Sequence, residues 1–93
     1  MILLAMSEKR IIEVKCKCGQ ALARYEKDHR GKLIKMYLER IVEDHAGVFL
    51  NKNYQLNEII YCPKCNQRVG TVVYIHGMKS AKLNQGQIMP IRT

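Results

Sequence analysis

The sequence predicts a small, mostly β fold, and three observations lead to this prediction. The chain has 93 residues, a length typical of one domain. Most of its apolar residues alternate with polar ones or form short β-branched runs, which are the patterns of half-buried and buried strands. Its four cysteines form two tight pairs far apart in the chain, and such pairs can cross-link a domain too small to bury a large core.

We expect a flexible N-terminus at residues 1–10 and one domain over residues 11–93. The first six residues, Met-Ile-Leu-Leu-Ala-Met, are too short for the hydrophobic core of a signal peptide and lack a preceding positive stretch. Met6 is an alternative to Met1 as the first residue. No segment approaches the ~20 apolar residues of a transmembrane helix. These features favour a cytoplasmic protein that has no membrane partner.

The first half of the chain predicts two strands around the first cysteine pair. Residues 11–15 alternate and lead into the pair, and residues 21–26 continue after it. The polar residues 27–31 end in glycine and predict a hairpin turn. Residues 32–42 fit both strand and helix patterns. We expect a strand at their start and a helical or irregular stretch near residues 39–45, which leaves room for one short helix.

Residues 46–57 carry little charge and predict a connecting loop that belongs to an elaborated central insertion. Phe49 and Leu50 are the large apolar residues of this loop, and we expect both to pack on the core. Residues 58–61 predict a strand that leads into the second cysteine pair.

Residues 69–75 form a continuous β-branched run, the clearest strand in the sequence. Residues 76–78 predict a turn, and residues 80–91 predict an edge strand that ends at Pro90. The expected core consists of apolar side chains from the predicted strands: Ile12, Val14, Leu22, Tyr25, Ile60, Val69, Val72, Val73 and Ile75.

The cysteine pairs are Cys16-Lys17-Cys18 and Cys62-Pro63-Lys64-Cys65. Each pair supplies two thiolates from one turn, and two facing turns present four sulfurs to a tetrahedral ion. The long spacer adds little cost, because closure entropy grows only with the logarithm of loop length. The pattern therefore predicts one structural zinc ion, with iron as an alternative for the same donors. The predicted metal ligands are Cys16, Cys18, Cys62 and Cys65.

The second pair resembles the knuckle of zinc-ribbon and rubredoxin-like proteins, in which Pro follows the first ligand and Gly often follows the second. Asn66 stands at the second position here, and asparagine tolerates left-handed backbone better than most residues. The first pair has Gly19 at that position but departs from the pattern as Cys-x-Cys. The resemblance implies a zinc ribbon with two knuckles.

A short internal repeat supports two equivalent halves, each with the order strand, knuckle, strand. Aligning the second cysteine of each pair matches Gln20 with Gln67, Leu22 with Val69, and Ala23 with Gly70. Upstream of the first cysteines, Val14-Lys15-Cys16 resembles Ile60-Tyr61-Cys62.

Other roles for the cysteines and histidines are less favoured. Disulfides belong mainly to oxidising compartments. A redox pair at Cys62 and Cys65 would need a strand-to-helix junction, whereas a strand pattern follows Cys65. The three histidines, His29, His45 and His76, have no ligand spacing to either pair, so no catalytic metal is predicted.

The formal net charge is +8, which favours a polyanionic partner such as nucleic acid. Residues 59–93 contain five basic residues and no acidic one. The candidate nucleic-acid contacts lie in or beside the knuckles: Lys15, Lys17, Arg24, Lys64 and Arg68. Tyr25, Tyr61 and Tyr74 can stack on unpaired bases, although packing in a small core explains them better.

The sequence therefore predicts a non-enzymatic structural-zinc module that binds nucleic acid, RNA ahead of DNA, or belongs to a ribonucleoprotein. The alternative is a protein–protein docking subunit that uses its apolar ends, residues 1–6 and 88–91. No nucleophile–base pair, Gly-rich phosphate loop or paired-carboxylate motif predicts an enzyme or a small-molecule substrate. A redox or rubredoxin-like iron protein is the weaker alternative.

Overall fold

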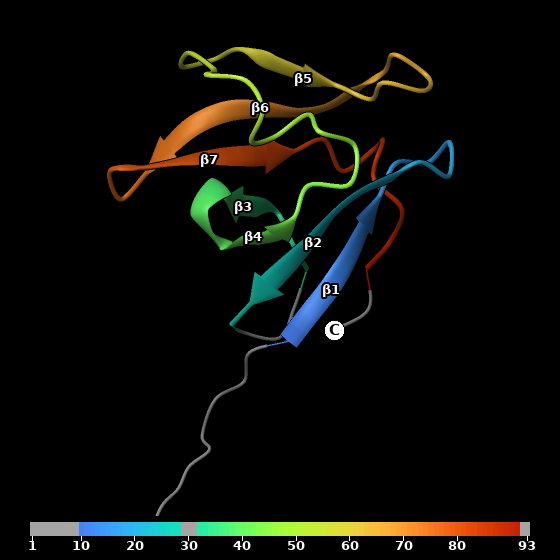
Figure 1. The fold of residues 1–93 in the computed structure, drawn as a ribbon, viewed down its shortest axis with the longest axis horizontal. Helices are drawn as coiled ribbons and strands as arrows, with labels where there is room; N and C mark the ends of the chain where they lie inside the picture. The colour runs from blue at the N-terminus through green and yellow to red at the C-terminus, as the bar shows by residue number, and fades with distance from the viewer. Residues whose placement is uncertain (1–9, 29–31, 92–93) are drawn as a thin grey trace, which may run out of the picture.

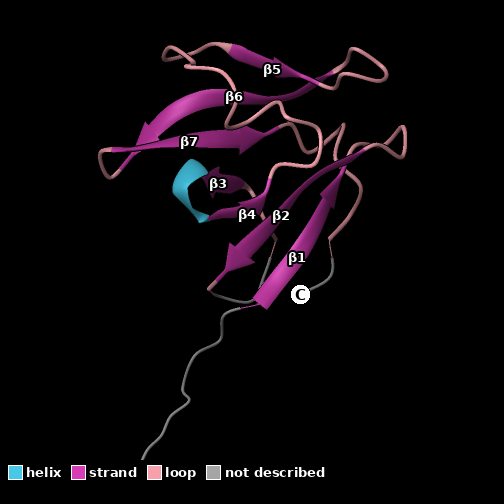
Figure 2. Ribbon diagram, in the orientation of Figure 1, coloured by secondary structure: helices cyan, strands magenta, loops and turns pink. Residues whose placement is uncertain are grey.

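Two antiparallel sheets form the fold of the computed structural model, which describes residues 10–28 and 32–91. One sheet has the strand order β1-β2-β4 and the other has the order β3-β7-β6-β5 (Figures 1 and 2). The predicted small, mostly β class is confirmed. The elements are β1 (Arg10–Lys15), β2 (Ala21–Lys27), β3 (Lys35–Tyr37), the 3-10 turn η1 (Leu38–Arg40), β4 (Ile41–Glu43), β5 (Ile59–Tyr61), β6 (Arg68–Ile75) and β7 (Met78–Leu83).

Of the predicted flexible segment, residues 1–10, only Arg10 lies within the described residues, and it begins β1. Met1, Met6 and the apolar residues 1–6, on which the predictions of the first residue and of an apolar docking end depend, lie outside the described residues. Within residues 10–28 and 32–91, no helix has the length and apolar character that crossing a membrane requires.

The hairpins β1-β2 and β5-β6 repeat one another in register, as the internal sequence repeat predicts. In the first hairpin the pairing passes over Leu22, and in the second it passes over Val69. These two residues are matched in the repeat, and both are fully buried. Each extra residue is a bulge beside a knuckle, where bulges bend a strand and change the direction of its end. The two knuckle turns consequently lie on the same side of the molecule, at the right in Figure 1.

The central segment passes from one sheet to the other. The strand that follows residues 27–31 was expected to complete a hairpin with β2, but β3 pairs with β7 and β2 pairs with β4. Fully buried Met36 explains this pairing, because it gives β3 a core-facing side chain in the four-stranded sheet. The backbone amide of Tyr37 donates to the hydroxyl of Tyr25 at 3.0 Å, which joins the two sheets. The expected short helix is only the single turn η1.

The predicted loop before β5 is held by the carboxylate of Asp44. It accepts hydrogen bonds from the backbone amides of Val48, Phe49 and Leu50, at 3.2, 2.9 and 2.8 Å. This turn directs Phe49 into the core, where it is fully buried. Leu50 remains 49% exposed, so its predicted core position is wrong: the turn that buries one side chain directs the next one outward.

The strand predicted over residues 80–91 is present in part as β7, which ends at Leu83, but its predicted edge position is wrong. The turn consists of His76 and Gly77, both with positive φ, so β7 begins at Met78 and lies between β6 and β3. Beyond β7, within residues 84–91, the pairing continues in an isolated bridge between Ile88 and Cys16.

Seven of the nine predicted core residues are buried, but Val73 and Ile75 are half-exposed. Both lie on the side of β6 opposite to Val72, because strand side chains alternate between faces. An apolar run without polar interruptions does not show which face is covered. The core also includes residues outside the expected set: Leu33, Met36, Ile41, Tyr54, Ala81, Leu83 and Ile88.

Phe49 and Leu50 provide a matched pair for testing the loop. Phe49→Ala should lower the free energy of unfolding by roughly 3–5 kcal/mol, because it leaves a cavity in the core. Leu50→Ala should change it by about 0.5 kcal/mol or less, since the side chain is half exposed. Denaturant unfolding of both variants measures the difference, and equal effects would contradict this account of the loop.

Candidate metal centre

The four cysteine sulfurs converge at one point. All lie within 4.8 Å of one another, and two close contacts join the two knuckles. Cys16 Sγ lies 3.6 Å from Cys65 Sγ, and Cys18 Sγ lies 3.6 Å from Cys62 Sγ. A tetrahedral ion with Zn–S bonds of ~2.3 Å requires sulfurs ~3.8 Å apart. The cluster therefore fits a tetrahedral ion, whereas a disulfide requires a separation of ~2.05 Å.

Equivalent backbone hydrogen bonds close both knuckles. The amide of Cys16 donates to Gln20 O and that of Cys62 donates to Gln67 O, both at 2.9 Å. In each case the residue after the second cysteine donates back to the carbonyl of the first, at 2.8 Å. The two knuckles differ in length by one residue: one residue separates Cys16 from Cys18, and two separate Cys62 from Cys65. The Cys-x-Cys departure therefore shortens the turn and keeps its hydrogen-bonding scheme.

Left-handed backbone follows the second cysteine of both knuckles. Gly19 has φ of +98° and Asn66 has φ of +66°, the conformation that the sequence predicts for Asn66. In the second knuckle the amide of Lys64 also points at Cys62 Sγ, at 3.4 Å. A backbone amide directed at sulfur stabilises the thiolate form that a metal requires.

The C-terminal segment completes the site. The amide of Lys17 donates to Gln87 O at 2.8 Å, and the amide of Met89 donates to Lys15 O at 2.9 Å. This pairing brings Gln87 Nε2 to 3.3 Å from Cys16 Sγ and 4.0 Å from Cys65 Sγ. Sequence reasoning missed Gln87, because it lies outside both knuckles and only the fold brings it to the sulfurs.

The sulfurs differ in their preference for the charged form. Burial raises the pKa of Cys16, but hydrogen bonds from the amide of Cys18 and from Gln87 outweigh it and lower this pKa to about 7. For Cys65, the amide of Gln67 favours the thiolate, yet burial and the neighbouring sulfurs raise the pKa to about 12. A cluster without a cation therefore resists complete ionisation, and a bound cation would remove this resistance.

Four thiolates fill a tetrahedral shell, which is the arrangement of structural rather than catalytic sites. Cys16 and Cys62 are fully buried, while Cys18 and Cys65 are partly exposed. His45 lies 3.4 Å from a carboxylate oxygen of Glu13, and exposed His76 lies in the turn before β7. His29 is outside the described residues.

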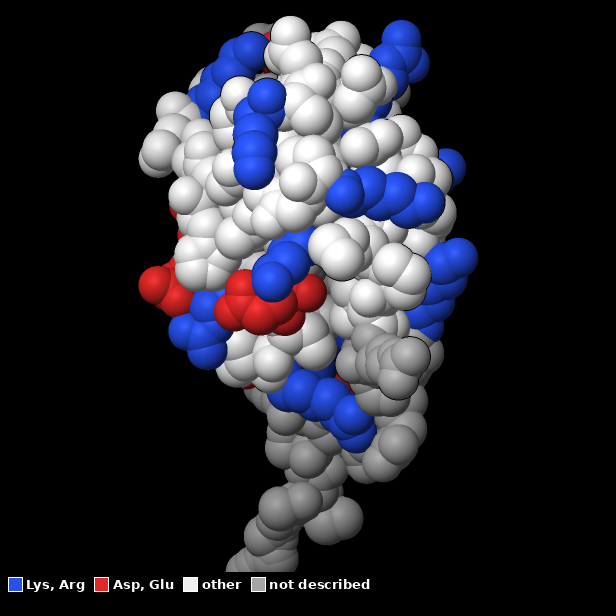
Figure 3. Space-filling view, turned by 90° about the vertical axis from the view of Figure 1, so that its right-hand side faces the viewer, with Lys and Arg blue, Asp and Glu red and all other residues white. Residues whose placement is uncertain are grey.

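Four of the five candidate nucleic-acid residues, Lys15, Lys17, Lys64 and Arg68, are exposed beside the knuckles. The remaining candidate, Arg24, lies 3.2 Å from Glu13 and 2.8 Å from Glu43, so its charge is already paired. Figure 3 views the knuckle end of the molecule: basic side chains spread over much of this face, and most of the acidic atoms gather in one region.

The three tyrosines have different surroundings. Tyr25 is buried, as core packing predicts, whereas Tyr61 and Tyr74 are 47% and 54% exposed. The prediction that the tyrosines pack in the core is therefore wrong for Tyr61 and Tyr74.

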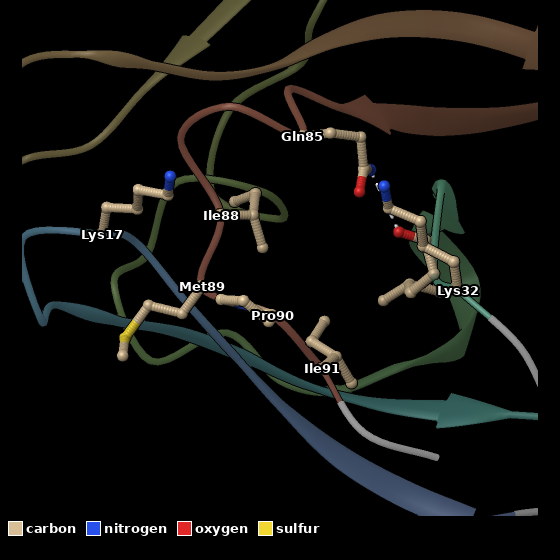
Figure 4. A pocket seen from close by; sticks show the side chains of 8 residues that line it. Lys17, Lys32, Gln85, Ile88, Met89, Pro90 and Ile91 are labelled. Atoms are coloured by element: carbon tan, nitrogen blue, oxygen red, sulfur yellow. Dashed lines mark hydrogen bonds between the residues drawn. The ribbon is translucent and has the colours of Figure 1, made fainter.

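A hollow of about 320 Å³ lies beside the C-terminal segment. In Figure 4 residues 88–91 run between Lys17 on one side and Lys32 on the other. Gln85 closes one end by donating to Leu33 O at 3.1 Å. The hollow is therefore lined by the last described residues, by Lys17 of the first knuckle and by the start of the central segment.

The fold and the cysteine cluster define a small, mostly β protein with a Cys₄ site that can hold a metal ion, an arrangement compatible with a zinc-ribbon-like module. No family model matches the chain, and searches of curated proteins and of solved structures found no match. The class therefore rests on the geometry of the cysteines and the sheets.

Gln87→Leu should weaken metal binding roughly 10- to 100-fold, because it removes a hydrogen-bond donor next to two ligands. Competition with a chromophoric chelator measures the affinity. Gln55→Leu is the matched control, since Gln55 is exposed in the loop before β5. Equal affinities for the two variants would show that Gln87 does not support the ligands.

Cys65→Ser should abolish tight metal binding and remove most of the cooperative unfolding transition. Metal binding contributes ~10–16 kcal/mol in small zinc-dependent domains, and these sulfurs join the two hairpins. Thermal melting followed by circular dichroism measures the effect. Excess chelator should reproduce it in the wild type, and chelator saturated with zinc should not. An unchanged transition in both experiments would show that no metal stabilises this fold.

Proposed function

We propose that the protein is a non-enzymatic module in which one structural zinc ion holds a basic surface that binds nucleic acid, RNA in preference to DNA. Zinc is preferred to iron because four cysteines in two facing turns are a common structural zinc set, although the same donors accept iron. Elemental analysis of protein purified without added metal distinguishes the two ions, and iron would also colour the protein.

The observation that carries the RNA proposal is the position of the exposed lysines relative to the metal centre. Lys17 lies between the two cysteines of the first knuckle, and Lys64 lies inside the second. Because the sulfurs of the two knuckles meet, both lysines belong to one end of the molecule. Lys15 and Arg68 flank the same knuckles and are also exposed. Such a group can contact several phosphates of one strand.

The metal leaves this surface basic. From the formal charge of +8, four thiolates and one divalent ion give 8 − 4 + 2 = +6. Part of the lysine charge offsets the formal charge of 2− on the unit of four thiolates and one divalent ion. The remainder provides the long-range attraction that draws a polyanion to the surface.

Wild-type protein loaded with zinc should bind a labelled single-stranded oligouridine, with an affinity that falls steeply as salt rises. Lys64→Gln should reduce the slope of log affinity against log salt by ~0.7, the value for one lost phosphate contact on a single strand. Fluorescence anisotropy over a salt series measures the slope.

Lys52→Gln is the matched control, because it removes one positive charge just as Lys64→Gln does. Lys52 Nζ lies 2.8 Å from a carboxylate oxygen of Glu58 and 5.0 Å from the centre of the Tyr54 ring, so its charge is already engaged. This variant should leave the slope unchanged. Absence of RNA binding by the zinc-loaded wild type would refute the proposed function.

A further inference from the structure

The four-stranded sheet has one covered face and one face that is partly open. Met36, Ala81 and Val72 lie side by side on β3, β7 and β6 and are buried. The neighbouring residues on each strand point to the other side, because side chains alternate along a strand. On this side Ser80 is fully buried, and Val73 and Ile75 are partly exposed. The basic sheet face is the part of this side formed by Lys35, Tyr61, Arg68, Thr71 and Lys82.

Two rows of cross-strand neighbours make up this face. Lys35 on β3 is opposite Lys82 on β7, which is in turn opposite Thr71 on β6. Near the second knuckle, Tyr61 on β5 is opposite Arg68 on β6. The register bulge at Val69 keeps Arg68 on the open side while Val69 and Gly70 are both buried.

The charges of this face are unbalanced. Lys35 and Lys82 are exposed and directly opposed, and like charges in this position destabilise a sheet. Thr71, the next residue in the row, is uncharged. A bound anion would relieve the repulsion between the two lysines.

A hollow in the surface lies beside Lys82, at the Thr71 end of this row. Its volume is about 380 Å³, and the residues that line it include Arg68, Thr71, Lys82 and Asn84. The Asn84 side chain donates to Arg68 O at 3.0 Å, which fixes the edge of the hollow. Guanidinium, ammonium and hydroxyl groups are the donors that proteins direct at phosphate oxygens.

Tyr61 supplies a ring beside this hollow. Its side chain is 47% exposed, and it stands directly opposite Arg68. An exposed ring next to cationic groups is the combination by which proteins bind single strands: the ring stacks on an unpaired base and the cations hold the backbone. A protein partner would not need this pairing of a flat ring with a polar hollow lined by cationic side chains.

We propose that the basic sheet face binds unpaired nucleotides of single-stranded RNA, with the backbone over Lys35, Lys82 and Arg68 and a base stacked on Tyr61. The proposal rests on the proposed function and deepens it, since it assigns single strands as the ligand and extends the path from the knuckle end onto the sheet. Arg68 connects the two surfaces, because it begins β6 immediately after the second knuckle.

The test compares two exposed tyrosines in zinc-loaded protein. Tyr61→Ala should weaken binding of a labelled single-stranded oligouridine roughly 10-fold, as loss of one stacked base does. Tyr61→Phe should bind like the wild type, because the ring remains. Tyr74→Ala is the matched control: Tyr74 is similarly exposed, but it lies opposite Lys79 at the far end of β6. Circular dichroism verifies that each variant is folded.

Lys82→Gln tests the backbone path. It should lower the salt slope by ~0.7, and a duplex probe of the same length should bind more weakly than the single strand, because paired bases cannot stack on Tyr61. If Tyr61→Ala and Tyr74→Ala bind equally, or if Lys82→Gln leaves the slope unchanged, the basic sheet face is not the site.

The outcomes separate this proposal from the proposed function. Wild-type binding that Lys64→Gln weakens but Tyr61→Ala and Lys82→Gln do not would leave the function in place and overturn the sheet-face proposal. Absence of single-strand binding by the wild type would overturn both. Loss through Tyr61→Ala together with a reduced slope in Lys82→Gln would support both.

Discussion

The convergence of four sulfurs on one point is the constraint on which the remaining structure depends. Thiol groups at 3.6 Å across the knuckles gain little from one another, and their thiolates repel. A tetrahedral cation bound by the four sulfurs would replace this repulsion with a cross-link between the two hairpins. Both hairpin bulges, the left-handed residues after the knuckles and the position of Gln87 serve to bring the sulfurs to one place.

The two knuckle hairpins repeat the same bulged pairing, and the elements between them carry the chain from one sheet to the other. Since the hairpins belong to different sheets, the chain between them must cross from one to the other. It does so through β3, η1 and β4, and the Tyr25 hydroxyl holds the crossing point. The loop organised by Asp44 then returns the chain to β5 and adds Phe49 to the shared core.

Local chemistry made the knuckles predictable from the sequence, whereas long-range pairing was not predictable. Cysteine spacing, Asn66 and the repeated flanking residues indicate the two turns and their strands without further information. The inner position of β7 depends on β3, which comes from a distant part of the chain. Val73 resembles Val72 in sequence, and only the cover on one face distinguishes them. Gln87 has no local signal, because tertiary structure alone brings it to sulfur.

The bridge between Cys16 and Ile88 has a consequence for biosynthesis. The first knuckle is among the first described segments to leave the ribosome, but its hydrogen-bonding partner is among the last. Domains complete their folding as units once the necessary residues have emerged. In the nascent chain, Cys16 and Cys18 therefore lack their partners in the fold until the second knuckle and the C-terminal segment are released. During that interval the fold cannot bury these two thiols, so their protection from oxidation and their metal supply depend on the cell.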